Sequence, residues 1–381
     1  METFKSNISP DLIRIIAKLL ERELHHHKLP AIDPHCFSER LISKLHDLEL
    51  KERVNLIAEE LNKALPRDFS KRANIVLAMI HPNELEKWNS QSSELGLCGW
   101  GVWPLTALVG TYGLGSTPRS LETLRQLTKR GTSEFDVRPF IEHDCAEATK
   151  IISSWADDDN LHVRKLVSEG TRPRLPWGIR LKSLIDNPKI MLPALTKLRD
   201  DPSDYVRRSV ANHLNDMSKD HPEFIADLAK AWMEDASAER KKLIRHACRT
   251  LIKQGHRRTL AVFGFVKPRI AKPTVSIANE NIKLGDSLGF NVSLSSNSTG
   301  SQNLVIDYVI YLRKANGLSV PKVYKWTKLH LKPNETRVLN WCHNFKEITT
   351  RRYYSGEHTI CLRINGEDYG HEKFGLEIES T

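Results

Sequence analysis

The sequence lacks several features that would assign it to a common class of protein. It has no apolar run that approaches the ~20 residues of a membrane-spanning helix, and its N-terminal residues lack the cleavage site of a signal peptide. Its six cysteines are scattered and form no CxxC pair, so no metal framework is indicated. We therefore expect a cytoplasmic protein with free thiols and no bound metal.

Familiar catalytic motifs are also missing. The chain contains no P-loop, no GxSxG elbow, no HExxH and no iron–sulfur cysteine run. What it does contain is an excess of cations: the formal net charge is +10 and the isoelectric point is about 9.2. This excess of positive charge favours a polyanionic partner but does not identify it.

Up to about residue 265 the apolar residues follow a helical period. Between residues 10 and 27, for example, Leu12, Ile16 and Leu19 fall on one face of a helix. Three segments also resemble one another: DDDNLHVRKLVSEG (157–170), DPSDYVRRSVANHL (201–214) and, more loosely, AERKKLIRHACRTL (238–251). Their spacing is typical of HEAT-like helix pairs, each of which buries its apolar face only against its neighbours.

From about residue 271 the period changes to two. In TICLRIN (359–365), Ile360, Leu362 and Ile364 alternate with polar residues, and roughly seven short strands are expected before the chain ends. The predicted fold is therefore multidomain: an all-α HEAT-like helical-repeat solenoid in residues 1–265, a proline-stiffened linker in 266–270, and an all-β immunoglobulin-like sandwich in 271–381.

The stretch VRKLVSEGTRPRLPWGIRLK (163–182) combines six cations with a single acid, Glu169. A helix is expected to end at Gly170, and two prolines precede Trp177. Two further acids, Glu134 and Asp216, lie outside ordinary helix faces. Taken alone, each is a common helix-end residue.

Three segments, RKLVSEGTRPRLPW, TSEFDVRPFIEHD and SDYVRRSVANHLNDMSKDHP, resemble those of the AlkC/AlkD DNA alkylation-repair glycosylases. The AlkC branch is the more similar, since it joins HEAT-like repeats to an immunoglobulin-like domain. The resemblance implies a bacterial enzyme of base excision repair that hydrolyses the N-glycosidic bond of 3-methyladenine or 3-methylcytosine in duplex DNA, without flipping the base. It implies no cofactor, and we expect a monomer.

The same resemblance implies roles for individual residues. Glu134, Glu169 and Asp216 would be the catalytic acids that face the deoxyribose, and Trp177 would pack against the sugar. Phosphate binding is expected from a set of cations made up of Arg164, Lys165, Arg172, Arg174, Arg207 and Arg208. Trp100 and Trp103 could contribute to the cleft or belong to the core.

Several alternatives stay open. The cations could be solvated helix residues, and the residues do not indicate which acid orients the attacking water. The Trp–Asp pair that marks AlkD is missing, which argues against tolerance of bulky adducts. A non-catalytic HEAT-repeat scaffold that binds DNA or an acidic protein is the second hypothesis, and the presence of all three acids argues against it.

Overall fold

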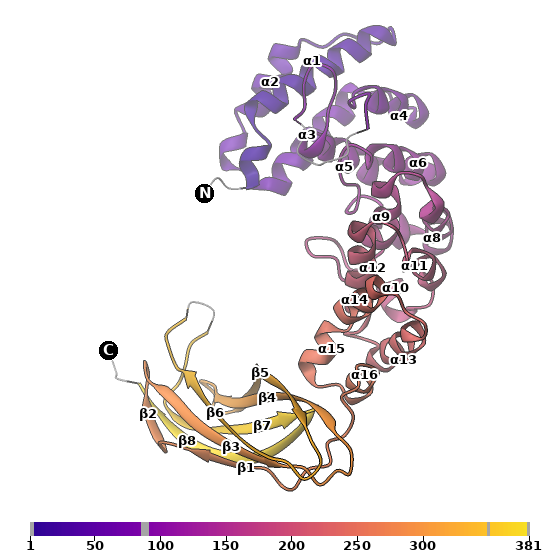
Figure 1. Ribbon diagram of the computed structural model, residues 1–381. Coiled ribbons are helices and arrows are strands. Elements are labelled where there is room, and N and C mark those ends of the chain that lie inside the picture. Colours follow the sequence, from indigo (N-terminus) through magenta and orange to yellow (C-terminus); the bar gives the residue numbers. More distant parts are fainter. Residues whose placement is uncertain (1–3, 85–90, 349–350, 379–381) are drawn as a thin grey trace. The chain divides into compact units, whose positions relative to one another are not determined.

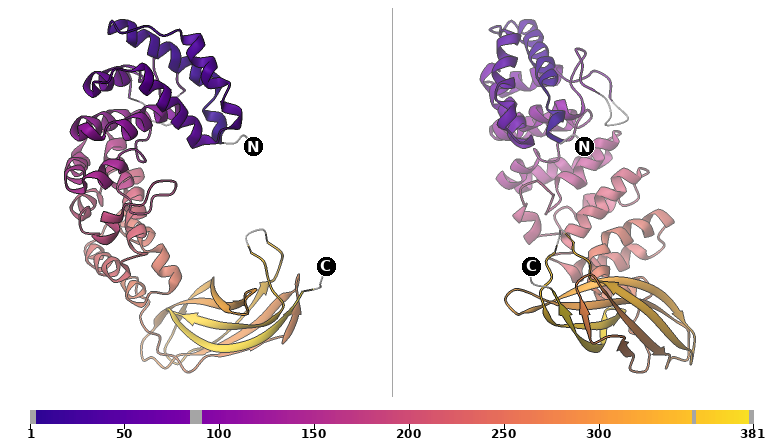
Figure 2. Two further views of the ribbon diagram at one scale, coloured as in Figure 1. Left: turned by 180° about the vertical axis from the view of Figure 1, so that it is seen from behind. Right: turned by 90° about the vertical axis from the view of Figure 1, so that its left-hand side faces the viewer.

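In the computed structural model, residues 4–84, 91–348 and 351–378 are described (Figures 1 and 2). Two compact units are distinguished: residues 1–220 with 238–247, and residues 221–237 with 248–381. Secondary structure changes from helix to strand between Val262 and Thr274. The domain boundaries predicted at 265 and 271 stay a prediction.

The first unit is built of helices. The helices of the described chain are α1 (Pro10–His26), α2 (Pro34–Ile42), α3 (Leu50–Ala64), α4 (Phe69–Ala78), α5 (Trp103–Tyr112), α6 (Thr117–Leu127), α7 (Arg138–His143), α8 (Cys145–Ser154), α9 (Leu161–Gly170), α10 (Lys182–Asp186), α11 (Leu192–Leu198), α12 (Asp204–Met217), α13 (Pro222–Met233), α14 (Ala238–Ala247), α15 (Arg249–Gln254) and α16 (Arg257–Val262). Short 3-10 helices are η1 (Phe4–Asn7), η2 (Leu45–Asp47), η3 (Gly99–Val102), η4 (Leu114–Ser116) and η5 (Trp155–Asp157). Of these, α13, α15 and α16 belong to the second unit. In the described part of the chain, no helix is both long and apolar enough to span a bilayer.

Local sequence determines where these helices begin. The Ser9 hydroxyl accepts a hydrogen bond from the backbone N–H of Leu12 at 3.2 Å, and Pro10 occupies the first position of α1. Asn160 caps α9 in the same way, accepting from the N–H of His162 at 2.9 Å. Trp103 is the first residue of α5.

The predicted helical repeats are present. The first two similar segments contain α9 and α12, which pack side by side, and the third contains α14, which packs against α12. The matching Val163 and Val206 are both fully buried. Consecutive repeats are also joined by ion pairs, because the Arg125 guanidinium binds the Asp158 carboxylate at 2.8 Å and Arg164 binds Asp201 at 2.7 Å.

The predicted β-sandwich is present too, with eight strands in the described residues: β1 (Thr274–Ile277), β2 (Asn281–Lys283), β3 (Ser287–Ser295), β4 (Gln302–Arg313), β5 (Ser319–Leu331), β6 (Thr336–Asn344), β7 (Gly356–Ile364) and β8 (Glu367–Glu377). One sheet has the order β1-β3-β6 and the other the order β2-β8-β7-β4-β5. All pairs are antiparallel except β2 with β8.

The sandwich core follows the predicted alternation. Ile360, Leu362 and Ile364 point inward and are buried with Phe290 and Phe374. A sharp turn at Asn365 and Gly366, where both backbone φ angles are positive, joins β7 to β8. All six cysteines are free thiols.

Two arginines that the sequence assigns to the same phosphate-binding set have different surroundings in the structure, and this difference can be tested. Arg164→Met removes the partner of the buried Asp201 carboxylate, so we expect a loss of about 2–4 kcal/mol in the free energy of unfolding. Arg208 is exposed, and no described residue bonds its guanidinium, so Arg208→Met should change stability by less than ~0.5 kcal/mol. Urea denaturation measures both, and equal losses would contradict this distinction.

Candidate active site

Gly170, at the end of α9, determines how closely two predicted acids approach. A Cβ atom at this position would lie 2.6 Å from Cγ2 of Val137 and 3.9 Å from Cα of Glu134. Only glycine therefore lets the segment before α7 pack on the end of α9. This packing brings Glu134 and Glu169 to the wall of one cavity of about 550 Å³.

The rest of that cavity, here called the cleft, is largely aromatic and apolar. Its lining residues are Gly99, Trp100, Trp103, Thr132, Glu134, Phe135, Glu169, Arg172, Leu175, Pro176, Trp177 and Tyr205. Both tryptophans of the GWGVW segment thus contribute, Trp103 stacking on Phe135 with ring centroids 5.4 Å apart. Because few polar groups line the cleft, a charge there is weakly screened.

Glu169 is buried and held by two partners. One carboxylate oxygen accepts from the Arg172 guanidinium at 2.6 Å, and the other accepts from the Ser209 hydroxyl at 2.6 Å. Burial alone would raise the pKa of Glu169, but the charges of Lys165 and Arg172, together with these hydrogen bonds, bring the pKa below its usual value. The acid is therefore ionised at neutral pH.

Asp216 occupies a different position from the other two acids. It does not line the cleft; its carboxylate accepts from Nε of Arg172 at 2.8 Å and from Lys219 at 2.9 Å. Arg172 is thus buried between Glu169 and Asp216, and these two charges outweigh burial in raising the pKa of its guanidinium. Asp216 acts on the cleft through Arg172.

Glu134 forms an ion pair with Lys165 and accepts a hydrogen bond from the Thr132 hydroxyl at 2.9 Å. The Lys165 ammonium also lies 5.7 Å from the centre of the Tyr205 ring. Burial would lower the pKa of Lys165, but the neighbouring Glu134 charge leads the interactions that raise it. One cation therefore connects an acid and an aromatic ring of the cleft.

Trp177 lies in the loop that joins α9 to α10, which projects from the helical stack in Figure 1. The Gly178 N–H donates to the Leu175 carbonyl at 3.1 Å, closing a turn with Trp177 at its third position. Trp177 has φ of 65°, and its side chain is 61% exposed. A positive φ costs a non-glycine residue about 1–2 kcal/mol, so the loop needs support.

The side chain of Arg138 supplies this support. Sequence reasoning did not single this residue out. Its guanidinium is fully buried and donates to the carbonyl groups of Gly170 at 2.9 Å, Arg172 at 2.8 Å and Ile179 at 2.9 Å. Burial lowers its pKa to about 10. The signal was available, because this arginine lies inside the quoted TSEFDVRPFIEHD segment. The same signal was available for Thr132 and Tyr205, which lie inside the quoted segments TSEFDVRPFIEHD and SDYVRRSVANHLNDMSKDHP.

The six predicted phosphate ligands differ in how they are engaged. Arg164 and Arg174 each form a two-pronged ion pair, with Asp201 and Asp220 respectively. Arg207 donates to the carbonyls of Asp201 and Pro202. Lys165 and Arg172 bind cleft acids, as described above. Arg208 differs from all of these, since it is exposed and lies one helical turn after Tyr205 on the same face of α12.

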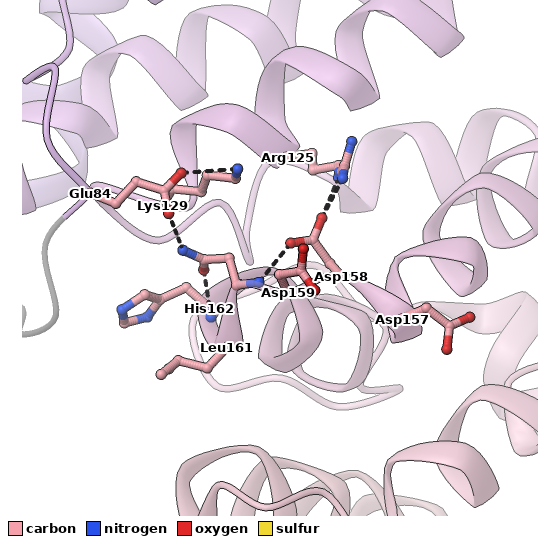
Figure 3. Close-up of a pocket in the computed structure, with 9 residues that line it drawn as sticks. Glu84, Arg125, Lys129, Asp157, Asp158, Asp159, Leu161 and His162 are labelled. Atoms are coloured by element: carbon pink, nitrogen blue, oxygen red, sulfur yellow. Dashed lines mark hydrogen bonds and ion pairs between the residues drawn. The ribbon is translucent and has the colours of Figure 1, made fainter.

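A second cavity of about 620 Å³ lies where α6 meets the start of α9 (Figure 3). Its Glu84 binds Lys129 at 3.0 Å and Asn160 at 2.9 Å, and Asp158 binds Arg125. These carboxylates link neighbouring helices and are neutralised by adjacent cations. Among the residues that the structure describes, no three His, Cys, Asp or Glu side chains form a group that could hold a metal ion.

Comparisons with known proteins support the fold. Residues 272–378 match the family model described as "Uncharacterised protein YhaZ, C-terminal Ig-like domain". The fold and this match define a helical-repeat protein with a C-terminal immunoglobulin-like domain.

Two full-length relatives identify the family. The uncharacterized protein YhaZ of Bacillus subtilis is 35% identical over 362 residues, covering 94% of this chain and 97% of that protein. The solved structure of the Pseudomonas fluorescens alkylpurine DNA glycosylase AlkC, bound to DNA with an abasic-site analogue, is similar with a TM-score of 0.79 and 30% identity, covering 99% and 100% of the two chains. The chain belongs to the AlkC family.

Asp136 is a half-buried acid beside the cleft that sequence reasoning did not single out. Its Oδ2 atom is buried and has no hydrogen-bond partner among the described residues. Burial is the main cause that raises the pKa of Asp136 to about 7. The Thr106 hydroxyl and the Lys51 charge oppose this rise, whereas the Glu134 charge adds to it. Asp136 therefore changes charge near neutral pH.

We expect Asp136→Asn to stabilise the protein at pH 8. The folded pKa is above the ordinary value of 3.8, so the ionised acid opposes folding increasingly as pH rises from about 4 to 7. The gain should be about 1–2 kcal/mol at pH 8, because partial exposure weakens the full effect, and should vanish below pH 4. Urea denaturation from pH 4 to 8 measures it; a gain independent of pH would contradict the raised pKa.

Proposed function

We propose that this chain is a monofunctional DNA glycosylase of base excision repair. Its substrates would be small cationic alkylated bases such as 3-methyladenine and 3-methylcytosine in double-stranded DNA, which it would remove without base flipping. The observation that carries the proposal is the Glu169 carboxylate, kept ionised at the wall of an aromatic cleft. Membership of the AlkC family supports the same conclusion.

The chemistry requires little from the protein besides negative charge. Alkylation of a ring nitrogen gives the base a positive charge, so it can leave without being protonated. As the C1′–N bond breaks, its electron pair neutralises the base and the sugar becomes oxocarbenium-like. A carboxylate ~4 Å from that charge contributes roughly 4 kcal/mol at an effective dielectric of ~20, or about three powers of ten in rate.

Glu134 and Glu169 are the acids suited to this role, because both line the cleft. Asp216 would support them by fixing Arg172. Trp177, exposed at the same cleft, would pack against the sugar. Water then forms the new C1′–O bond and releases a proton, leaving an abasic site and a neutral free base.

Hydrolysis is favoured over a Schiff-base lyase reaction. Lys165 is the lysine paired with a cleft acid, and its raised pKa keeps the amine protonated. A protonated amine cannot attack C1′. No cofactor is required for this chemistry. We also expect a monomer in the bacterial cytoplasm, in agreement with the free cysteines.

Glu169→Gln and Glu134→Gln should each reduce base release by about 100- to 1000-fold. Affinity for undamaged duplex should change less than about threefold, because phosphate binding depends on cations. Release is measured by chromatography of bases from methylated duplex DNA under single-turnover conditions, with thermal unfolding as the folding control. Folded variants that release bases at the rate of the unsubstituted chain would exclude these acids. A chain that binds duplex but releases no base would support the scaffold hypothesis.

Arg208 is the strongest of the proposed phosphate ligands, since it is exposed beside the cleft residue Tyr205. Arg208→Ala should weaken binding to damaged and undamaged duplex alike and reduce the slope of log affinity against log salt by about 1. The matched control is Arg207→Ala, whose guanidinium bonds backbone carbonyls instead. Fluorescence anisotropy between 50 and 200 mM salt measures both. An unchanged salt slope for Arg208→Ala would show that Arg208 does not bind a phosphate.

A further inference from the structure

The support from Arg138 ends at the base of the Trp177 loop, and the tip is held by different residues. Lys51, on α3, donates a hydrogen bond to the backbone carbonyl of Trp177, which lies 126 positions later in the chain. Its ammonium also lies 5.6 Å from the centre of the Phe135 ring, which lines the cleft. Lys51 therefore joins α3 to the residue with the strained backbone.

Phe4, in η1, contacts the same loop from the outside. Its ring lies 6.5 Å from that of Trp177, edge to face at 80°, and 6.3 Å from that of Trp100. All three rings are exposed, Phe4 by 66% and Trp100 by 38%. An edge-to-face aromatic pair gains about 0.5–1.5 kcal/mol beyond the area that it buries. The contact with Phe4 thus restricts the Trp177 indole.

Neither residue lines the cleft, so neither is suited to touch the reacting atoms. Both touch Trp177, which does line it. Lys51 fixes the backbone at the residue whose φ is unfavourable, and Phe4 fixes the side chain. Together they act on one residue through two independent contacts.

We propose that Phe4 and Lys51 are positioning residues that hold the Trp177 indole in the orientation required by the damaged nucleotide, an inference that rests on the proposed glycosylase function. Small displacements of a group that positions substrate can cost a factor of about 100 in rate. Loss of either contact should therefore slow base release more than it weakens DNA binding. The N-terminal η1 and α3 would then be part of the active site.

The test compares three variants, Lys51→Met, Lys51→Arg and Phe4→Ala, with the control Lys44→Met. Lys44 is an exposed lysine near α3 that makes no contact with Trp177. Under single-turnover conditions, Lys51→Met and Phe4→Ala should release 3-methyladenine about 10- to 100-fold more slowly. Their affinity for undamaged duplex should change less than about twofold. Lys51→Arg should recover most of the rate, because a guanidinium can also donate to the carbonyl. Lys44→Met should behave as the unsubstituted chain.

A second measurement does not depend on activity. With 5-fluorotryptophan incorporated, Trp177→Phe identifies the fluorine resonance of residue 177. We expect Lys51→Met and Phe4→Ala to shift or broaden that resonance and leave most of the other tryptophan resonances in place. A purely structural role would move many resonances and lower the unfolding temperature.

The outcomes separate the two proposals. If the unsubstituted chain releases no base, the proposed glycosylase function is wrong. If, in addition, the Trp177 resonance does not change in Lys51→Met and Phe4→Ala, these residues do not position Trp177 either. If it releases base but the variants do so at the same rate, Phe4 and Lys51 have no positioning role, whatever the resonance does. A fall in the salt slope of duplex binding by about 1 for Lys51→Met would make Lys51 a phosphate ligand and overturn the inference.

Discussion

The candidate site depends on one buried cation. Arg172 lies between Glu169 and Asp216 and bonds to both, at 2.6 and 2.8 Å. A buried carboxylate without such a partner would take up a proton, and a buried guanidinium without acids would be strongly destabilising. Together with the Lys165 charge, the triad therefore keeps Glu169 charged where it reaches the cleft. It also joins α9 to α12, so the electrostatics of the cleft and the packing of the repeats rely on the same contacts.

The carbonyl of Arg172 takes part in a second network, because it accepts a hydrogen bond from Arg138. The two arginines have different tasks. Arg172 bonds to side-chain carboxylates and sets the charge of the cleft, whereas Arg138 bonds to backbone carbonyls and shapes the loop that carries Trp177. Both are buried, and both belong to segments that the sequence comparison with AlkC had marked. Within these segments, some residues line the cleft and others hold them in place.

Much of the fold could be predicted from sequence because burial has a period. Val163 and Val206 indicated equivalent helices, and Ile360, Leu362 and Ile364 indicated a strand with one inward face. Side-chain partners were harder to predict. Arg207 and Arg208 are adjacent in sequence, yet neighbouring helix positions point about 100° apart, so one bonds to backbone carbonyls and the other is exposed. The acids Glu134 and Glu169 could be paired only through a resemblance, since their proximity depends on Gly170. The contacts of Lys51 and Phe4 with Trp177 span most of the helical chain and leave no local pattern.

The ion pairs between consecutive repeats restrict where a further repeat could be inserted into this chain. Arg125 reaches forward to Asp158, and Arg164 reaches forward to Asp201, so at these two junctions one repeat supplies a cation to the acid of the loop that follows. An inserted or duplicated unit would have to carry both an acid for its predecessor and an arginine for its successor, or leave an unmatched charge at the new junction. Recombination between relatives should therefore succeed most readily when the exchange point keeps each such arginine together with its acid.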